Sequence, residues 1–128
     1  MPELCLVAID FKDKHYALSY MDLSTGEFKV TELSEFSAVV GEIASLKARE
    51  IVAGFTLDES QLKVFERQMN LLISEQLEIP ENLLIDLSGL TALENQVASK
   101  LLAYVKETQM RDLSHLQEVE HYEIKDFL

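Results

Sequence analysis

The chain has 128 residues, with 23 Asp and Glu against 11 Lys and Arg, which gives a formal net charge of −12. Nucleic-acid binding and attraction to anionic membranes both depend on Lys and Arg side chains, so this charge excludes an isolated domain built for either task. Hydrophobic residues make up 48% of the chain, with only 4 Gly and 2 Pro, and this composition predicts one compact globular domain.

The first part of the chain predicts three consecutive antiparallel strands. Residues 4–11 are apolar on both alternating faces, which is typical of a central strand covered on both sides. A short polar break leads to a second strand over residues 15–21. Turn-forming residues follow at 22–26, where Gly26 can adopt a positive φ. The third strand, over residues 27–32, alternates polar and apolar residues, so we expect it to be half exposed and near an edge.

From Ser34 onward, the apolar residues recur with a helical period and predict helices that alternate with short strands. Ser34 is expected to cap a helix whose apolar face extends to Leu46. Residues 51–53 are apolar and suit a buried parallel strand reached through that helix. Asp58 and Gln61 then have the spacing of a capping box, which predicts the start of a second helix.

The second half of the chain predicts one more short strand, a long helix and a final strand. Residues 71–73 form the short apolar strand, and residues 74–88, which include Pro80, are interpreted as an exposed connection. Residues 89–109 have the clearest amphipathic helical pattern of the sequence. Residues 116–128 alternate in polarity and predict the last strand.

The predicted element order is three strands followed by three helices that each lead into a further strand. This order indicates an α/β domain with a mixed sheet, in which a three-stranded antiparallel meander precedes parallel strands joined by flanking helices. It is the order of the ribonuclease H-like fold, in which the first strand is central. The fold alone does not assign a function.

The sequence gives no sign of a membrane or secreted protein. No apolar run approaches the roughly 18 to 20 residues that cross a membrane, and the first residues lack the basic start and long apolar stretch of a secretion signal. We therefore expect a cytoplasmic protein with no membrane partner. Cys5 is the only cysteine, which excludes an internal disulfide, and its apolar neighbours predict a packing role.

Asp10, at the end of the first strand, is the candidate for metal-dependent chemistry. Nucleases of this fold hold two divalent metal ions with converging carboxylates, because hard cations prefer oxygen ligands. The fourth strand ends in Ala53 and Gly54, where a second carboxylate would be needed, and Glu42 on the first helix is the remaining partner. A nuclease that uses Asp10 and Glu42 is therefore the alternative to a strand-end carboxylate without a catalytic role.

No other set of residues has the spacing of a catalytic or metal-binding motif. The spacing of His15, His115 and His121 does not match a common zinc motif, and a single cysteine cannot supply the set of thiolate ligands of a zinc site. The chain has neither a nucleophile elbow nor a phosphate-binding loop. We predict no catalytic residue, no metal and no cofactor in this domain.

The segment from Thr108 to Leu116 mixes polar residues with apolar anchors between the longest helix and the last strand. One interpretation is a helix end, in which Arg111 meets the negative end of the helix dipole while Leu113 and Leu116 contact the core. The other is a contact surface for a neighbouring domain or partner, with a polar rim around the apolar anchors.

Three stretches of the sequence resemble one known family. They are residues 16–28 (YALSYMDLSTGEF), residues 101–109 (LLAYVKETQ) and residues 113–116 (LSHL). Together they are similar to the connector domain of the MutS family of bacterial DNA mismatch-repair proteins. The similarity extends over nearly the whole chain in consistent order, although residues 74–88 are short for the family.

The resemblance implies that residues 1–128 form a single connector domain of a longer polypeptide. In the family, this domain has a ribonuclease H-like fold without nuclease activity, links the mismatch-binding domain to the core and ATPase domains, and offers a surface for MutL. ATP and Mg²⁺ are implied for the full-length protein, which is a DNA-dependent ATPase. Mismatched DNA would be bound by its other domains.

The resemblance also implies candidate contact residues. Part of the MutL-facing surface of the family is a pair of glutamines in the region that matches residues 74–88, where this chain has Gln76 and, two positions later, Glu78. Thr108, Gln109 and His115 match family positions as well. These five residues are the candidates for contact with MutL or with the adjoining domains.

Overall fold

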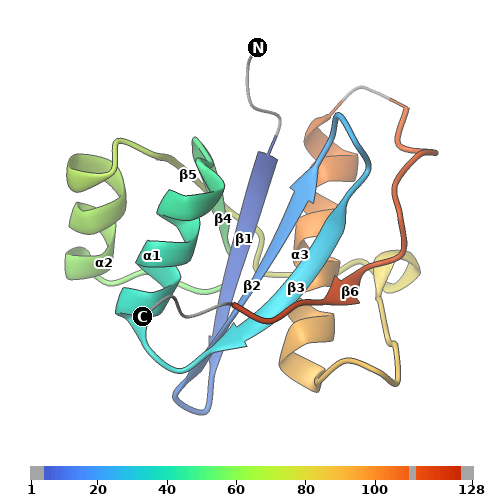
Figure 1. Ribbon diagram of the computed structural model, residues 1–128, viewed down its shortest axis with the longest axis horizontal. Coiled ribbons are helices and arrows are strands. Elements are labelled where there is room, and N and C mark those ends of the chain that lie inside the picture. Colours follow the sequence, from blue (N-terminus) through green and yellow to red (C-terminus); the bar gives the residue numbers. More distant parts are fainter. Residues whose placement is uncertain (1–4, 110–111, 125–128) are drawn as a thin grey trace.

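The computed structural model describes residues 5–109 and 112–124, which form a six-stranded mixed sheet with helices on both faces (Figure 1). The strand order is β5-β4-β1-β2-β3-β6, with antiparallel pairing from β1 to β3 and parallel pairing for the remaining neighbours. This is the predicted ribonuclease H-like arrangement. The strands are β1 (Cys5–Lys12), β2 (His15–Asp22), β3 (Phe28–Leu33), β4 (Glu50–Ala53), β5 (Leu72–Glu75) and β6 (Glu120–His121).

Helices cover both faces of the sheet. The long helix α3 packs on β1, β2 and β3 from one side, while α1 and the segment formed by α2 and η1 pack on the other (Figure 1). No helix among the described residues is long and apolar enough to cross a membrane. The helices are α1 (Phe36–Leu46), α2 (Glu59–Lys63), the π-helical turn η1 (Val64–Gln68), the 3₁₀ turn η2 (Glu81–Leu83) and α3 (Ala92–Thr108).

The core consists of two hydrophobic clusters, one on each face of the sheet. Alternation along β1 separates them, because Leu6 and Ala8 join the cluster under α3 whereas Val7 and Ile9 join the cluster under α1. All four side chains are buried, which confirms the prediction of a central strand covered on both sides. Cys5 packs against the α1 cluster, which confirms its packing role, but it is half-buried and not fully buried as the sequence predicts.

Capping interactions explain where two of the helices begin. Asp58 accepts a hydrogen bond from Gln61 N at 2.8 Å, and Gln61 Oε1 accepts one from Asp58 N at 3.0 Å, which confirms the predicted capping box. Thr91 and Glu94 form the same reciprocal pair at the start of α3. The predicted cap at Ser34 is wrong, because the residue at the N-cap position of α1 is the next one along the chain, and it makes no side-chain cap.

The third strand is more buried than predicted. Phe28, Val30, Thr31 and Leu33 are all buried, because α3 covers one face of β3 and β6 pairs with its outer side. Only Lys29 and Glu32 are half-buried, so the alternation of polar and apolar residues overstates the exposure of this strand. The prediction that β3 lies near an edge is confirmed, since only the short β6 lies beyond it.

The last two predicted segments also differ from expectation. Residues 74–88 are not simply an exposed connection, because β5 extends to Glu75 and the partly buried Ile85 and Leu87 pack against the α3 cluster. Their backbone N–H groups donate to side chains of α3, at 2.8 and 2.9 Å. The final strand contains only two residues, and the predicted positions 125–128 lie outside the described residues.

Candidate functional site

The end of β1 holds a buried ion pair between Asp10 and Lys100. Asp10 is 3% exposed on the face that α3 covers, and Lys100, from α3, is 4% exposed. Lys100 Nζ lies 2.7 Å from Asp10 Oδ2 and donates to the carbonyl oxygen of Gly54, also at 2.7 Å. The other carboxylate oxygen of Asp10 accepts from Phe11 N at 2.9 Å. Both charges therefore have the hydrogen-bond partners that a buried ion pair requires.

Gly54, at the end of β4, makes room for this lysine. A Cβ atom at Gly54 would lie 2.8 Å from Lys100 Cδ and 3.1 Å from Asp10 Cγ. A carboxylate-bearing side chain at this position would therefore displace the lysine. The ammonium group of Lys100 fills the place where the carboxylates of a two-metal site would have to converge, between the ends of β1 and β4.

Glu42, the second carboxylate of the nuclease alternative, lies on the opposite face of the sheet. It belongs to α1, and its carboxylate accepts a hydrogen bond from the hydroxyl of Tyr122 at 2.6 Å. Burial, together with this hydrogen bond, raises the pKa of Tyr122 above its usual value of 10.0. The sheet separates Asp10 from Glu42, and no group of three or more His, Cys, Asp or Glu among the described residues could hold a metal ion. The described residues thus do not fit a pair of divalent ions.

Gln76 and Glu78 lie together directly after β5. Gln76 continues the pairing of β5, since its N donates to Ala53 O at 2.9 Å, and its side-chain Nε2 donates to the carbonyl oxygen of Glu78 at 2.8 Å. The Glu78 side chain is exposed and Gln76 is half-buried. The structure therefore brings these two candidate contact residues side by side at the β5 edge of the sheet.

Thr108 and Gln109 end the long helix α3. Thr108 is exposed, and its hydroxyl donates to Tyr104 O at 2.7 Å, while Gln109 is half-buried and closes the helix through its backbone N–H. No hydrogen bond among the described residues joins either of them to Gln76 or Glu78. The candidate contact residues therefore fall into two groups, one after β5 and one after α3.

His115 holds the segment after α3 against the turn between β2 and β3. Its ring Nε2 lies 2.8 Å from Leu23 O, so this nitrogen carries the proton and donates. Gly26 has a φ of +85°, and a Cβ there would lie 2.3 Å from the carbonyl oxygen of His115. Gln117 N also donates to Gly26 O at 2.9 Å. Two of the three sequence stretches that carry the family resemblance, residues 16–28 and 113–116, are thus in direct contact.

A groove of about 740 Å³ lies beside this contact, between the second half of α3 and the segments 84–87 and 112–119. Leu113 and Leu116 line it and also pack against the α3 cluster, which confirms that these two residues contact the core. The predicted role of Arg111 falls outside the described residues. The groove is mixed in character, because Lys106 and Asp112 line it together with the leucines.

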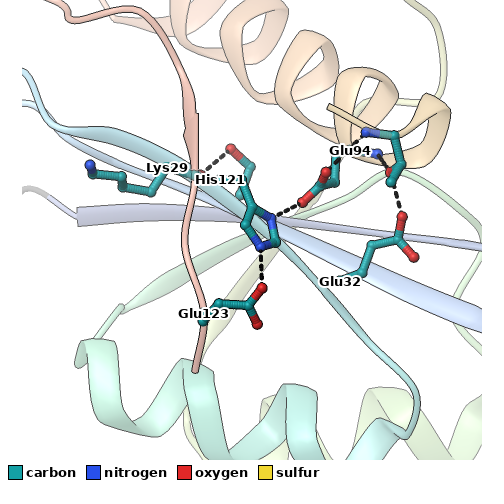
Figure 2. Close-up of polar contacts among 7 residues, drawn as sticks. Lys29, Glu32, Glu94, His121 and Glu123 are labelled. Carbon is teal, nitrogen blue, oxygen red and sulfur yellow. Dashed lines mark hydrogen bonds and ion pairs between the residues drawn. The ribbon is translucent and has the colours of Figure 1, made fainter. Parts of the chain in front are cut away.

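A second polar cluster, which no sequence motif predicts, surrounds His121 of β6 (Figure 2). His121 Nδ1 lies 2.5 Å from Glu94 Oε2, and its Nε2 lies 2.7 Å from Glu123 Oε1. Glu94 is buried and also accepts from Thr91 N in the capping box of α3. Hydrogen bonds to Glu123 and to Glu94 raise the pKa of His121 above its usual value of 6.5, against the opposite effect of burial.

The His121 cluster fastens β6 to α3 and does not form a metal site. Glu94 and Glu123 bind opposite nitrogens of the imidazole ring, so their carboxylates do not converge on a common point (Figure 2). Lys29 of β3 adds an exposed ion pair with Glu120 at 3.5 Å. Only the spacing of His121 and Glu123 is visible in the sequence, since Glu94 is 27 residues away from the histidine.

Comparisons with known proteins give a consistent result. The family model described as MutS domain II matches residues 5–117. Two proteins described as DNA mismatch repair protein MutS, from Lactococcus lactis subsp. cremoris strains MG1363 and SK11, are 93% and 92% identical over 123 residues. The protein of the same description from Streptococcus gordonii is 54% identical over 123 residues. Each match covers 96% of the chain, which spans only about 15% of the length of these curated relatives.

Proposed function

The chain belongs to the MutS domain II family, and we propose that it acts as the connector domain of a DNA mismatch-repair ATPase. In this role it links the mismatch-binding domain to the core and ATPase domains of a longer polypeptide. The observation that carries the proposal is the family match over residues 5–117, in a chain that spans about 15% of its relatives. ATP, Mg²⁺ and mismatched DNA would be bound by the other domains.

The connector role includes no catalysis by this domain. Three features support that part of the proposal: Asp10 is paired with Lys100, Gly54 leaves no room for a second carboxylate beside it, and Glu42 lies across the sheet. A domain whose polar groups are used in holding its layers together is suited to passing movement between neighbours. Catalysis would instead require convergent groups open to a substrate.

The nuclease alternative is tested by incubating the chain with single- and double-stranded DNA and Mg²⁺ or Mn²⁺. We expect no cleavage by the wild-type chain. Asp13→Asn is the matched control, because Asp13 is an exposed residue of the turn between β1 and β2. Cleavage that Asp10→Asn abolishes and Asp13→Asn leaves intact would overturn the non-catalytic role.

The surface for MutL is proposed to include Gln76 and Glu78, with Thr108, Gln109 and His115 facing MutL or the adjoining domains. Support comes from the exposure of Glu78 and Thr108 and from the position of Gln76 beside the sheet edge. In full-length MutS that carries this domain, Gln76→Cys and Glu78→Cys are expected to crosslink to MutL in the ATP- and DNA-bound state. Ser45→Cys, on exposed α1 surface, is the isosteric control. Equal crosslinking at all three positions, or none, would count against this surface.

A further inference from the structure

The outer edge of β5 offers backbone hydrogen-bonding groups that no other strand of the described residues takes up. Leu72 N and Gln76 N donate to carbonyl oxygens of the β4 side, each at 2.9 Å. In a parallel pair the bonded residues alternate along the strand, so Ile73 and Glu75 turn their N–H and C=O groups away from β4. β5 ends the sheet on this side, and these groups therefore form an open edge.

Two of the usual protections of an open edge are missing at β5. The strand contains no proline and no lysine, and Leu72 is 70% exposed, more than any other large hydrophobic residue described. At the opposite end of the sheet, β6 is only two residues long and is fastened by the His121 cluster. The β6 edge is thus short and attached to α3, whereas the β5 edge is longer and exposed. This difference indicates a binding role for the β5 edge.

A groove of about 670 Å³ runs beside this edge, between β5 and the segment formed by α2 and η1. Leu57, Leu62 and Ile73 give it an apolar floor. Its charged lining residues are Glu66 and Glu75. Glu66 also lines a neighbouring hollow together with Lys63 and Arg67, so Glu75 is the acidic residue of the groove that has no basic residue in the same hollow. An open strand edge with a groove beside it is a geometry in which an extended peptide can add to a sheet.

We propose that the β5 edge binds an extended segment of a partner protein, which carries both apolar residues and Lys or Arg on one face, as an added strand of the sheet. The partner's backbone bonds to Ile73 and Glu75, and every second side chain of its strand faces the groove. There its apolar side chains contact the floor and its basic side chains face Glu66 and Glu75. A second copy of this chain is disfavoured as the occupant, because the net charge of −12 makes two copies repel each other.

The test uses a short synthetic peptide that carries valine and lysine at every second position, along one face, with threonine between them. A peptide with glutamate in place of lysine is its charge-reversed control. Titration is followed by amide NMR, and we expect slower hydrogen exchange at Ile73 and Glu75 once the peptide is bound. Because the probe is synthetic, the outcome is independent of the connector role and of MutL.

Two substitutions of Glu75 separate the contribution of its charge to peptide binding from the contribution of its backbone N–H group. Glu75→Gln keeps the outward N–H and removes only the charge, so binding is expected to weaken slightly and to lose part of its salt dependence. Glu75→Pro also removes the outward donor without touching the bonds to β4, and binding is expected to weaken by about tenfold. Glu107→Gln, on exposed α3 surface, is the matched control and should bind as the wild type does.

The proposal is overturned by any of three results. The first is that the acidic peptide binds as well as the basic one. The second is that the Glu75→Pro chain binds the basic peptide with unchanged affinity while its melting temperature is retained. The third is that the amides of Ile73 and Glu75 stay unprotected at saturation. Self-association of the chain that Glu75→Pro abolishes would also overturn it, because a second copy would then occupy the edge.

Discussion

Lys100 extends from α3 to the end of the central strand, where its ammonium group neutralises Asp10 and holds the carbonyl oxygen of Gly54. One side chain thereby joins β1, β4 and α3. Replacing it by methionine would keep most of its length but leave the Asp10 carboxylate buried without a counter-charge.

We expect Lys100→Met to lower the free energy of unfolding by about 3 to 5 kcal/mol, since breaking one side of a buried ion pair strands the other charge. The double variant Asp10→Leu with Lys100→Met removes both charges and should recover most of this loss. Urea denaturation of the two variants beside the wild type measures the difference. Equal stability of the single and double variants would contradict the importance of the stranded charge.

His121 is the residue through which pH acts on the attachment of β6. The groups that face it are Glu94 from α3 and Glu123 from its own segment, with the ion pair of Lys29 and Glu120 beside it. The pKa of His121 is raised in the folded chain, mainly by the hydrogen bonds to Glu123 and Glu94. The stabilisation is therefore complete below the usual pKa of 6.5 and is lost as the pH rises through the raised value.

The matching prediction is that the urea midpoint of the chain falls as the pH rises above neutrality, and that His121→Gln removes this part of the pH dependence. An NMR titration of the imidazole ring should show the raised pKa directly. A ring that titrates at or below its usual value would contradict the attachment through Glu94 and Glu123.

Among the elements, the turn between β2 and β3 depends on one glycine. Gly26 combines a φ of +85° with the close approach of the His115 carbonyl oxygen, so a side chain there meets both backbone strain and a collision. The turn is otherwise held by Asp22, whose carboxylate accepts from Ser24 N at 2.9 Å and whose pKa is lowered chiefly by the hydroxyl of Ser24.

Gly26→Ala is expected to lower the free energy of unfolding by at least about 1 kcal/mol and to shift the amide resonances of residues 112–117. Gly41→Ala is the matched control, because Gly41 lies inside α1 and a Cβ there meets nothing within 4 Å. That control should stabilise the chain by about 0.5 to 1 kcal/mol. Similar effects of the two substitutions would show that the turn does not depend on Gly26.

The elements that the sequence predicts well are those specified by local signals. The apolar run of β1 and the capping box of Asp58 and Gln61 depend on neighbouring residues, and both are present as expected. The start of α1 is shifted by one residue from Ser34, and Phe36 in its first turn packs against Phe65 at a ring separation of 5.3 Å. The shifted start of α1 is thus accompanied by a tertiary contact, which cannot be predicted from neighbouring residues alone.

The candidate site was less predictable for the same reason. Asp10 is recognisable as a strand-end carboxylate, but its partner Lys100 is 90 residues away, and the pattern of α3 marks that lysine only as one charged residue in a helix. Glu94 is hidden in a similar way, because its position suits a capping box whether or not a histidine binds it. Contacts between residues so far apart in the sequence can be identified only once the fold is known.

At the scale of the whole molecule, the segment 119–124 connects the two helical layers around the β3 side of the sheet. Val119 belongs to the α3 cluster and Ile124 packs against the α1 cluster. Between them, His121 binds Glu94 of α3 and the Tyr122 hydroxyl donates to α1. The short β6 is thus part of a longer connection between the two faces.

The net charge of −12 gives a prediction for the chain as a whole. By itself it is expected to bind neither matched nor mismatched duplex DNA, even at low salt, where the release of counterions favours binding most. Fluorescence anisotropy with labelled duplexes measures this, with full-length MutS as the positive control. Affinity of the chain for DNA that falls steeply as salt is added would contradict the assignment of DNA contacts to other domains.

The 90-residue separation of Asp10 and Lys100 also matters while the chain is being made. At about 5 to 20 residues per second, the ribosome delivers the lysine roughly 5 to 20 seconds after the aspartate. During that interval the central strand carries a carboxylate with no counter-charge, and the meander of β1, β2 and β3 lacks the helix that covers it. The middle of the sheet, which is synthesised first, therefore reaches its final stability only when α3 has been added.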